Sequence, residues 1–354
     1  MKHHMLCIII SCMNTPIKAY SIEGIFQLVK ELGLPKFRGS QILSWLYAKH
    51  AGSYEEMSNL PAVLRNQLSE EHPLYTPQII DKQTSIDGTR KYVLEFNDHV
   101  IAETVGIPSE DGRLTVCVSS QAGCAMKCAF CATGKQGLTR NLLPGEIVDQ
   151  ILTVEEDFGC RVSNIVVMGQ GEPFANYDNT LTALRICNNE KLLNIGARKI
   201  TVSSCGILTG IEKFSHEPEQ FTLAISLHAA RQNVRDKIMP GVAGMPLSKL
   251  RAAIESYLRQ TDRRITFEYA LMRGVNNSKE DLASLIDFCS GLLCHVNLIC
   301  LNEIEDSPFK PVSEKEMLSW CESLNNAGIN ATIRRSKGED IAGACGQLAN
   351  SFLK

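Results

Sequence analysis

The alternation of strands and helices after residue 113 most constrains how this chain of 354 residues can fold. Short apolar runs typical of buried strands are separated by segments in which apolar residues recur at helical spacing. We expect strands at Leu114–Ser119, Asn164–Gly169, Lys199–Ser203, Phe221–Leu227, Ile265–Leu271, Val296–Leu301 and Asn330–Ile333. We expect helices between them, among them Pro144–Asp157, Pro246–Gln260, Lys279–Cys289 and Glu314–Ala327. Repeated units of this kind predict an α/β fold with a parallel sheet, open or closed as a barrel, whose chemistry lies at the carboxyl ends of the strands.

Two smaller regions precede this core, and a short one follows it. Apolar residues recur at helical spacing over residues 21–75, which predicts a small helical domain. Residues 76–112 hold short β-prone runs and predict a β-hairpin or small meander. The core is expected over residues 113–335, and residues 336–354 are expected to form a C-terminal loop and tail.

The beginning of the chain and its cysteines indicate the compartment. The stretch from Met5 to Met13 is apolar but about half as long as a helix that spans a bilayer, and no small-residue cleavage pattern follows it. We therefore expect residues 1–20 to be a disordered or mis-started segment, with Met13 as the alternative start to Met1. The 14 cysteines are spread through periodic segments, which indicates a reducing compartment. We expect a cytoplasmic protein without a membrane partner.

Three cysteines follow the first strand of the core in the spacing Cys-x3-Cys-x2-Cys, at Cys124, Cys128 and Cys131. Three thiolates on one loop can ligate three irons of a four-iron cluster and leave the fourth iron open to a small ligand. Structural zinc requires a closed set of four ligands and usually shows a second paired motif. The spacing favours an iron–sulfur cluster. The alternative is a zinc loop in a non-catalytic RNA-binding protein.

Polar residues also follow successive strands of the predicted sheet. Gly171 and Glu172 come after the second strand, where a carboxylate can pair with an ammonium group and glycine allows close backbone approach. Ser203 ends the third strand, and the segment Ser226-Leu227-His228 ends the fourth. Hydroxyl and imidazole groups can bond a ribose or a carboxylate. Since these strand ends share one rim, we expect one binding site.

With the aromatic residue Phe130, the cysteine loop resembles the radical S-adenosylmethionine (SAM) superfamily. There the open iron binds the amino and carboxylate groups of SAM, and an electron from a 4Fe-4S cluster cleaves SAM to a 5′-deoxyadenosyl radical. The resemblance implies a partial (βα)6 barrel with a small N-terminal helical accessory domain and a β-hairpin extension. It also implies SAM contacts from Gly171, Glu172, Ser203, Ser226, Leu227, His228 and Asn302.

Two further segments narrow the resemblance to the RlmN/Cfr family of radical SAM RNA methyltransferases. They are Cys117-Val-Ser-Ser-Gln-Ala-Gly-Cys124 and Gly343-Ala-Cys345-Gly-Gln-Leu348, and the similarity runs from about Tyr20 to Gln347. The chain departs from the family at Cys300-Leu301-Asn302-Glu303, where members commonly carry Pro-Trp-Asn-Pro, and at Gln170, which replaces a methionine. These departures bear on the shape of the adenine-side pocket and leave the cluster loop intact.

The family resemblance implies a role for each catalytic residue. Cys345 takes a methyl group from one SAM, and a second SAM supplies the radical that converts this methyl group into a carbon fragment able to add to adenine. Glu103 removes a proton, and Cys117 attacks the Cys345 sulfur to form a transient disulfide. The implied targets are C2 of an adenosine in 23S rRNA and of the adenosine next to the tRNA anticodon. A Cfr-like enzyme acting on adenine C8 is the alternative within the family.

RNA contacts must come from local groups of basic residues, because a formal net charge of −3 excludes a protein that binds nucleic acid through its overall charge. The candidates are Lys36, Arg38, Lys135, Arg140, Arg198, Lys199, Arg231, Arg235, Arg263, Arg264, Arg334, Arg335 and Lys337. Phe37 either stacks on RNA or packs in the core. Other expected partners are an electron donor such as a flavodoxin or ferredoxin, and the protein is expected to be a monomer.

Overall fold

A computed structural model describes residues 15–304 and 306–349. Its centre is a ten-stranded sheet in the order β1-β2-β3-β4-β7-β8-β9-β10-β11-β12. The strands from β4 to β12 within this sheet run parallel. Their bounds are β4 Leu114–Cys117, β7 Asn164–Val167, β8 Ile200–Ser204, β9 Thr222–Ser226, β10 Ile265–Leu271, β11 Cys294–Cys300 and β12 Ala331–Arg334. Within the described residues β12 pairs only with β11, so the barrel is open.

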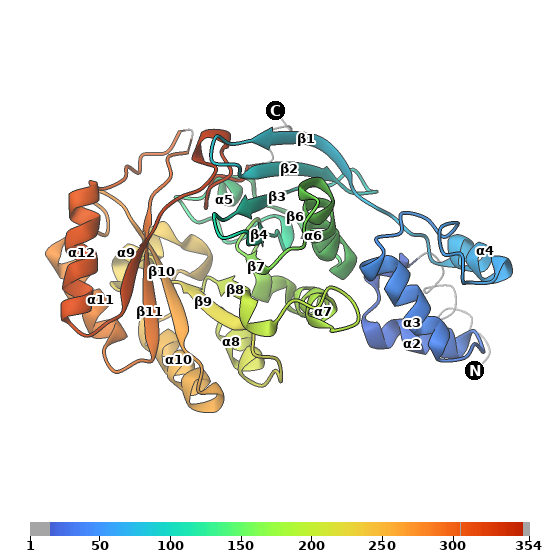
Figure 1. Cartoon of the computed structure of the whole chain (residues 1–354). Coiled ribbons are helices and arrows are strands. Elements are labelled where there is room, and N and C mark those ends of the chain that lie inside the picture. The colour runs from blue at the N-terminus through green and yellow to red at the C-terminus, as the bar shows by residue number, and fades with distance from the viewer. Residues whose placement is uncertain (1–14, 305, 350–354) are drawn as a thin grey trace.

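Helices cover the outer face of the curved parallel sheet (Figure 1). They are α6 Pro144–Phe158, α7 Tyr177–Asn188, α8 Leu208–Ser215, α10 Leu247–Thr261, α11 Lys279–Cys289 and α12 Glu314–Asn326. The short helix α9 Gln232–Ile238 instead packs beside the cysteine loop, at the carboxyl ends of β8 and β9. Local sequence explains their limits. Helix α6 has a proline in its first turn and ends at Gly159, whose φ of 64° suits glycine. Helix α11 is capped by Ser278, the residue before its first turn, whose hydroxyl accepts a hydrogen bond from the Asp281 amide at 3.1 Å. The predicted repeated units are therefore confirmed.

The expected β-hairpin is a three-stranded antiparallel meander that continues the barrel sheet. Its strands are β1 Gln78–Thr84, β2 Arg90–Glu95 and β3 Ile101–Pro108. β3 pairs with β4 in antiparallel register, with Val105 opposite Cys117. The meander thus extends the sheet next to the first barrel strand, and Figure 1 shows the C-terminal segment lying beside it.

The cysteine loop lies on a small sheet that the sequence did not indicate. The expected strand Leu114–Ser119 ends at Cys117, because the chain turns there into a second sheet. That sheet pairs β5 Gln121–Gly123 with β6 Leu138–Asn141, and the short helix α5 Ala132–Gln136 lies between them. The Cys124 amide donates to the Gly137 carbonyl at 2.7 Å, which closes the base of the loop.

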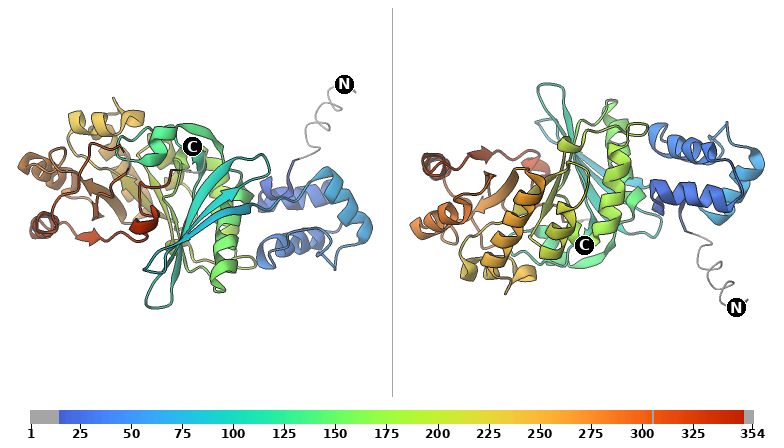
Figure 2. Two further views of the ribbon diagram at one scale, coloured as in Figure 1. Left: turned by 90° about the horizontal axis from the view of Figure 1, so that it is seen from above. Right: turned by 90° about the horizontal axis from the view of Figure 1, so that it is seen from below.

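The N-terminal lobe lies at one end of the molecule beside α6 and α7 (Figure 2). It contains α2 Ile22–Glu31, α3 Phe37–Leu43, a π-helical turn at Ser44–Ala48 and α4 Ala62–Glu71. No helix of the described residues is long and apolar enough to cross a membrane.

Along the described residues as a whole, short 3-10 helices lie at Ile17–Ala19, Pro173–Asn176, Ala197–Lys199, Pro240–Val242 and Glu339–Ile341.

Part of the segment 1–20, for which disorder was expected, is ordered in the structure, from residue 15 onward. Ile17 is fully buried, and Lys18 Nζ lies 2.6 Å from Asp149 Oδ1 on α6 with both side chains buried. A buried ion pair and an apolar anchor fix this segment against the barrel. Residues 1–14, including Met13, lie outside the described residues.

Candidate active site

Two adjoining cavities open at the carboxyl ends of the barrel strands. The smaller, of about 160 Å³, is lined by the three loop cysteines and by polar residues from the ends of several strands. The larger, of about 960 Å³, lies between the meander and the C-terminal segment. Both are lined by Cys131, Met168, Arg334 and Cys345, so they communicate. The site is one continuous chamber with an inner and an outer part, which we call the inner and the outer cavity.

The loop cysteines face the inner cavity as a group. Burial raises the pKa of Cys124 to about 11, and the neighbouring Cys131 and Glu172 add to the rise. Burial also raises the pKa of Cys128, and Cys131 and Cys124 raise it further. The thiols therefore lie close enough to repel one another as anions, and positive iron would remove that repulsion.

The loop fits a cluster better than a single ion. Among the described residues, no three His, Cys, Asp or Glu side chains are arranged to hold one metal ion. In a four-iron cluster each cysteine binds a different iron, so the sulfurs do not converge on one point. Phe130 packs against the ring of His228 with centroids 4.7 Å apart, which places an apolar wall beside the loop.

Glu172 is a fully buried carboxylate at the end of β7, on the wall of the inner cavity. Its oxygens accept hydrogen bonds from the amides of Phe174 at 2.9 Å and Cys205 at 2.7 Å. Burial raises its pKa, and these two amides oppose the rise. A carboxylate held in this way favours a cationic ligand such as an ammonium group.

Gly171 allows the backbone to turn beside this carboxylate. Its φ is +102°, and an added Cβ would lie 2.6 Å from the Gln121 side chain.

We expect Gly171→Ala to lower the free energy of unfolding by about 2 kcal/mol and to weaken SAM binding, because backbone strain at positive φ and steric overlap with Gln121 act together. Thermal unfolding and equilibrium dialysis measure the two effects. Gly196→Ala is the matched control, since its Cβ would meet nothing within 4 Å; equal losses in both variants would contradict the prediction.

Three further polar residues at strand ends line the inner cavity as expected. The hydroxyls of Ser203 and Ser226 lie 3.2 Å apart. His228 Nδ1 accepts a hydrogen bond from the Ala270 amide at 3.0 Å, and burial lowers the pKa of His228 to about 3. The ring is therefore neutral near pH 7 and carries its proton on Nε2, which makes it a hydrogen-bond donor.

Two of the expected cofactor residues are used differently. Leu227 is fully buried in the apolar core and is not part of the cavity wall, so its side chain does not face the site. Asn302 does line the inner cavity, but its Nδ2 donates to the Cys345 carbonyl at 3.0 Å. Its Oδ1 accepts from the Ser336 hydroxyl at 2.6 Å. Asn302 thus bonds the C-terminal segment at two points, Ser336 and Cys345.

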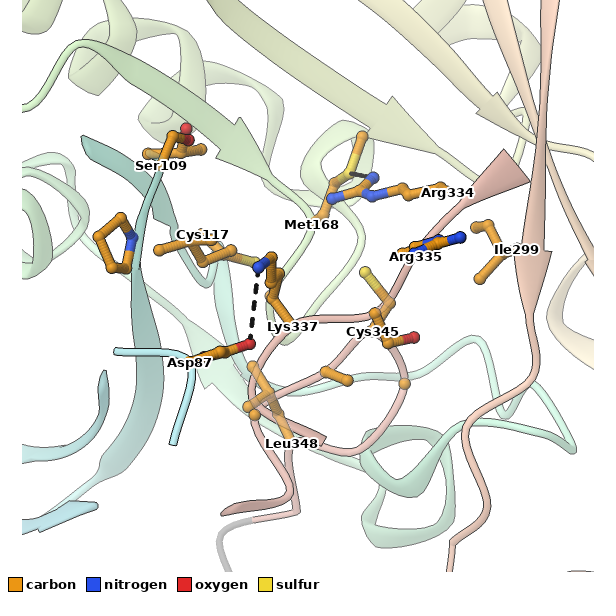
Figure 3. A pocket seen from close by; sticks show the side chains of 18 of the residues that line it. Asp87, Ser109, Cys117, Met168, Ile299, Arg334, Arg335, Lys337, Cys345 and Leu348 are labelled. Carbon is orange, nitrogen blue, oxygen red and sulfur yellow. Dashed lines mark hydrogen bonds and ion pairs between the residues drawn. The ribbon is translucent and has the colours of Figure 1, made fainter. Parts of the chain in front are cut away.

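Cys117 and Cys345 both line the outer cavity, although they are 228 positions apart in sequence, from 117 to 345. Figure 3 shows the Cys345 sulfur pointing toward Met168 and Arg334, with Cys117 on another wall of the same space. Burial raises the pKa of Cys117 to about 12, Cys345 adds to the rise, and Arg334 opposes it. The two thiols therefore lie within electrostatic reach of one another.

Glu103 is buried on β3, next to these cysteines but outside the lining of both cavities. Its Oε2 accepts a hydrogen bond from the Ala349 amide at 2.9 Å, and its Oε1 lies 4.0 Å from Lys91 Nζ. Leu348 packs against Val105 and Cys117. The last described residues of the C-terminal tail therefore cover Glu103 in this structure.

Two basic residues that the sequence suggested as RNA contacts bind acceptors within the protein. Arg235 is buried and donates to the carbonyls of Leu227 and Cys205. Arg140 is partly exposed and pairs with Asp98 and Glu146. Their use as RNA contacts stays a prediction. Phe37, by contrast, is 54% exposed, so it is not a core residue, and the Arg38 guanidinium lies 4.8 Å from its ring centre.

Comparison with known proteins decides the family. The family model described as Radical SAM superfamily matches residues 118–288, and that of the ribosomal RNA large subunit methyltransferase N-terminal domain matches residues 18–73. A protein of Clostridium novyi named probable dual-specificity RNA methyltransferase RlmN is 43% identical over 320 residues, which cover 90% of this chain and 93% of that protein. The chain belongs to the RlmN family. An RlmN relative of the same description from Akkermansia muciniphila is also 43% identical, over 94% of both chains.

A solved structure agrees with the RlmN assignment. A radical SAM methyltransferase from Sphaerobacter thermophilus is 40% identical and superposes with a TM-score of 0.89. The match covers 94% of this chain and 99% of that one. The radical SAM fold and its cofactors, a 4Fe-4S cluster and SAM, follow from this membership. In this RlmN family chain the cysteine loop supplies three thiols, which fits three cluster ligands with one iron left for SAM.

Among the charged residues that line the inner cavity, the sequence did not indicate Glu268 and suggested only an RNA contact for Arg334. Glu268 on β10 lines the inner cavity, and Arg334 at the end of β12 lines both cavities. Arg334 was expected at an RNA surface, but it is largely buried beside Cys345, Glu268 and Cys117, each of which raises its pKa. A lone charged residue on a strand gives no sequence signal for such a position.

Proposed function

We propose that this chain methylates C2 of adenosine in RNA through a methyl group carried on Cys345. The observation that supports this most is the joined chamber. Its outer cavity holds Cys117 and Cys345, and its inner cavity holds Cys124, Cys128 and Cys131. A methyl-carrying thiol must reach both a SAM and the target base, and Cys345 borders both cavities.

Each protein group has one task in this proposal. The cluster and SAM, when bound, supply a radical that removes a hydrogen atom from a methyl group. The Cys345 thiolate first displaces the methyl group from SAM, forming a sulfur–carbon bond while the sulfonium bond breaks. After hydrogen removal, the carbon radical on Cys345 adds to C2 and joins protein and RNA. The adduct must then give up one electron, for which the oxidised cluster, when bound, would be the acceptor.

Release of the RNA requires Glu103 and Cys117. Glu103 takes the C2 proton as general base. The Cys117 thiolate attacks the Cys345 sulfur, so the carbon leaves on the RNA with the bonding electron pair, takes up a proton and becomes the methyl group, and a Cys117–Cys345 disulfide remains. A reductant must reopen this disulfide before the next turnover. Val105 pairs with Cys117 across β3 and β4, so Glu103 and Cys117 lie on neighbouring strands, as the two tasks require.

The proposed substrates are 23S rRNA and the tRNA adenosine next to the anticodon, with an electron donor of the flavodoxin or ferredoxin type. Arg335 and Lys337 line the outer cavity with side chains 88% and 51% exposed, which suits contacts with RNA phosphates at its mouth. Phe37 and Arg38 offer an exposed aromatic and a cation on the N-terminal lobe. We further propose that the protein acts as a monomer in the cytoplasm.

Anaerobic reconstitution tests the enzyme against the zinc-loop alternative. We expect the purified protein to take up iron and sulfide, to cleave SAM when reduced, and to transfer label from methyl-labelled SAM to RNA. Cys128→Ala should lose all three properties, because one cluster ligand is missing. Uptake of zinc alone, without SAM cleavage, would reject the enzyme.

A further inference from the structure

A buried carboxylate that lines the inner cavity has one oxygen without a hydrogen-bond partner among the described residues. Glu268 lies on β10 and is 3% exposed. Its Oε1 accepts a hydrogen bond from Asn297 Nδ2 at 3.0 Å. Its Oε2 is buried and has no hydrogen-bond partner among the described residues. A buried acceptor without a donor is costly, so this atom indicates a donor supplied by a ligand.

The neighbours of Glu268 show what kind of donor fits. In the strand register Glu268 lies opposite Ser226, whose hydroxyl contacts that of Ser203. A row of two hydroxyls and one carboxylate thus crosses three adjacent strands. Sugar hydroxyls both donate and accept hydrogen bonds, so a ribose matches such a row better than a group that only donates or only accepts.

The other parts of SAM belong elsewhere in the inner cavity. Glu172 acts electrostatically on Cys124 and Cys128, which places the cationic amino end of SAM near the cysteine loop. The carboxylate of SAM would be repelled by Glu268. The flat adenine suits the apolar wall formed by Met239, Ala270, Ile299 and Leu301.

We propose that Glu268 is a further SAM-binding residue, whose Oε2 accepts a hydrogen bond from a ribose hydroxyl of SAM. The proposal rests on the proposed radical SAM function, because it assumes SAM in the inner cavity. Burial raises the pKa of Glu268, and Arg334 and Asn297 oppose that rise by stabilising the carboxylate. Asn297 occupies Oε1, so Oε2 is left for the ligand.

Binding of deoxyribose analogues tests this contact. The cluster-reconstituted protein is kept oxidised, so SAM is not cleaved, and affinities for SAM, 2′-deoxy-SAM and 3′-deoxy-SAM are measured by equilibrium dialysis. We expect the unaltered protein to bind at least one analogue roughly 10- to 100-fold more weakly than SAM, the range for a hydrogen bond to a charged group. Glu268→Ala should bind SAM and that analogue alike.

Controls separate this contact from folding and from the proposed function. Glu303→Ala removes an exposed carboxylate that lines neither cavity, and it should keep the discrimination. If Glu268→Ala does not fold, Glu268→Gln replaces it and should reduce the discrimination at least about threefold. Full discrimination in the Glu268 variant, or none in the unaltered protein, would overturn the proposal. If the protein discriminates between SAM and the analogue as expected but methylates no RNA, the proposed function is rejected and the Glu268 contact stands.

Discussion

Cys117→Ala is expected to leave RNA covalently attached to the protein. The steps before release depend on Cys345, the cluster loop and SAM, and this substitution alters none of them. Without the Cys117 thiol, nothing attacks the Cys345 sulfur, so the carbon bridge between Cys345 and the base persists. Turnover of free methylated RNA should fall roughly a hundredfold or more, as for loss of a nucleophile.

The attached RNA is measured by denaturing gel electrophoresis and by mass spectrometry of the nuclease-treated protein. The bridge should map to Cys345, and Cys345→Ala together with Cys117→Ala should abolish it. Cys294→Ala is the matched control, since Cys294 is also a buried strand cysteine but lines neither cavity. Free methylated RNA at the normal rate from Cys117→Ala would remove Cys117 from the mechanism.

Glu103→Gln is expected to stop the reaction one step earlier. The amide keeps the shape of the carboxylate and can still accept from the Ala349 amide, so the fold should be retained. It cannot take a proton, and loss of a general base costs roughly 100- to 10,000-fold in rate. RNA should therefore stay attached to Cys345 even though Cys117 is present.

Deuterium exchange distinguishes this arrest from that of Cys117→Ala. The adduct trapped by Glu103→Gln should retain the hydrogen at adenine C2, which mass spectrometry of C2-deuterated RNA detects. Glu95→Gln on the neighbouring strand β2 is the control, because Glu95 bonds only the exposed His99 among the contacts described. Normal turnover by Glu103→Gln would assign the base to another residue.

Periodicity in the sequence was enough to predict an α/β fold with a parallel sheet, and the family resemblance implied the partial barrel. Apolar runs at the strand positions and spaced apolar residues between them gave the repeated units, and the observed bounds differ mostly by a few residues. The turn after Cys117 was not predictable in this way. The run Leu114–Ser119 is uniformly compatible with a strand, and only the pairing of β5 with β6 ends it early.

The candidate site was predictable where its residues follow a fixed sequence spacing or lie at the end of a predicted strand. Cys124, Cys128 and Cys131 form a motif, and strand-end position indicated Ser203 and His228. Glu268 and Arg334 have no such signal, because each is one charged residue on a strand whose partners come from distant segments. The role of Leu227 as a SAM contact stays a prediction: it lies between two cavity residues, but its side chain packs in the core.

The position of the new methyl group tests the central claim most directly. RNA methylated by the purified, cluster-loaded protein is digested to nucleosides and analysed by mass spectrometry beside authentic standards. The proposed methylation at C2 predicts 2-methyladenosine. The appearance of 8-methyladenosine without 2-methyladenosine would contradict it.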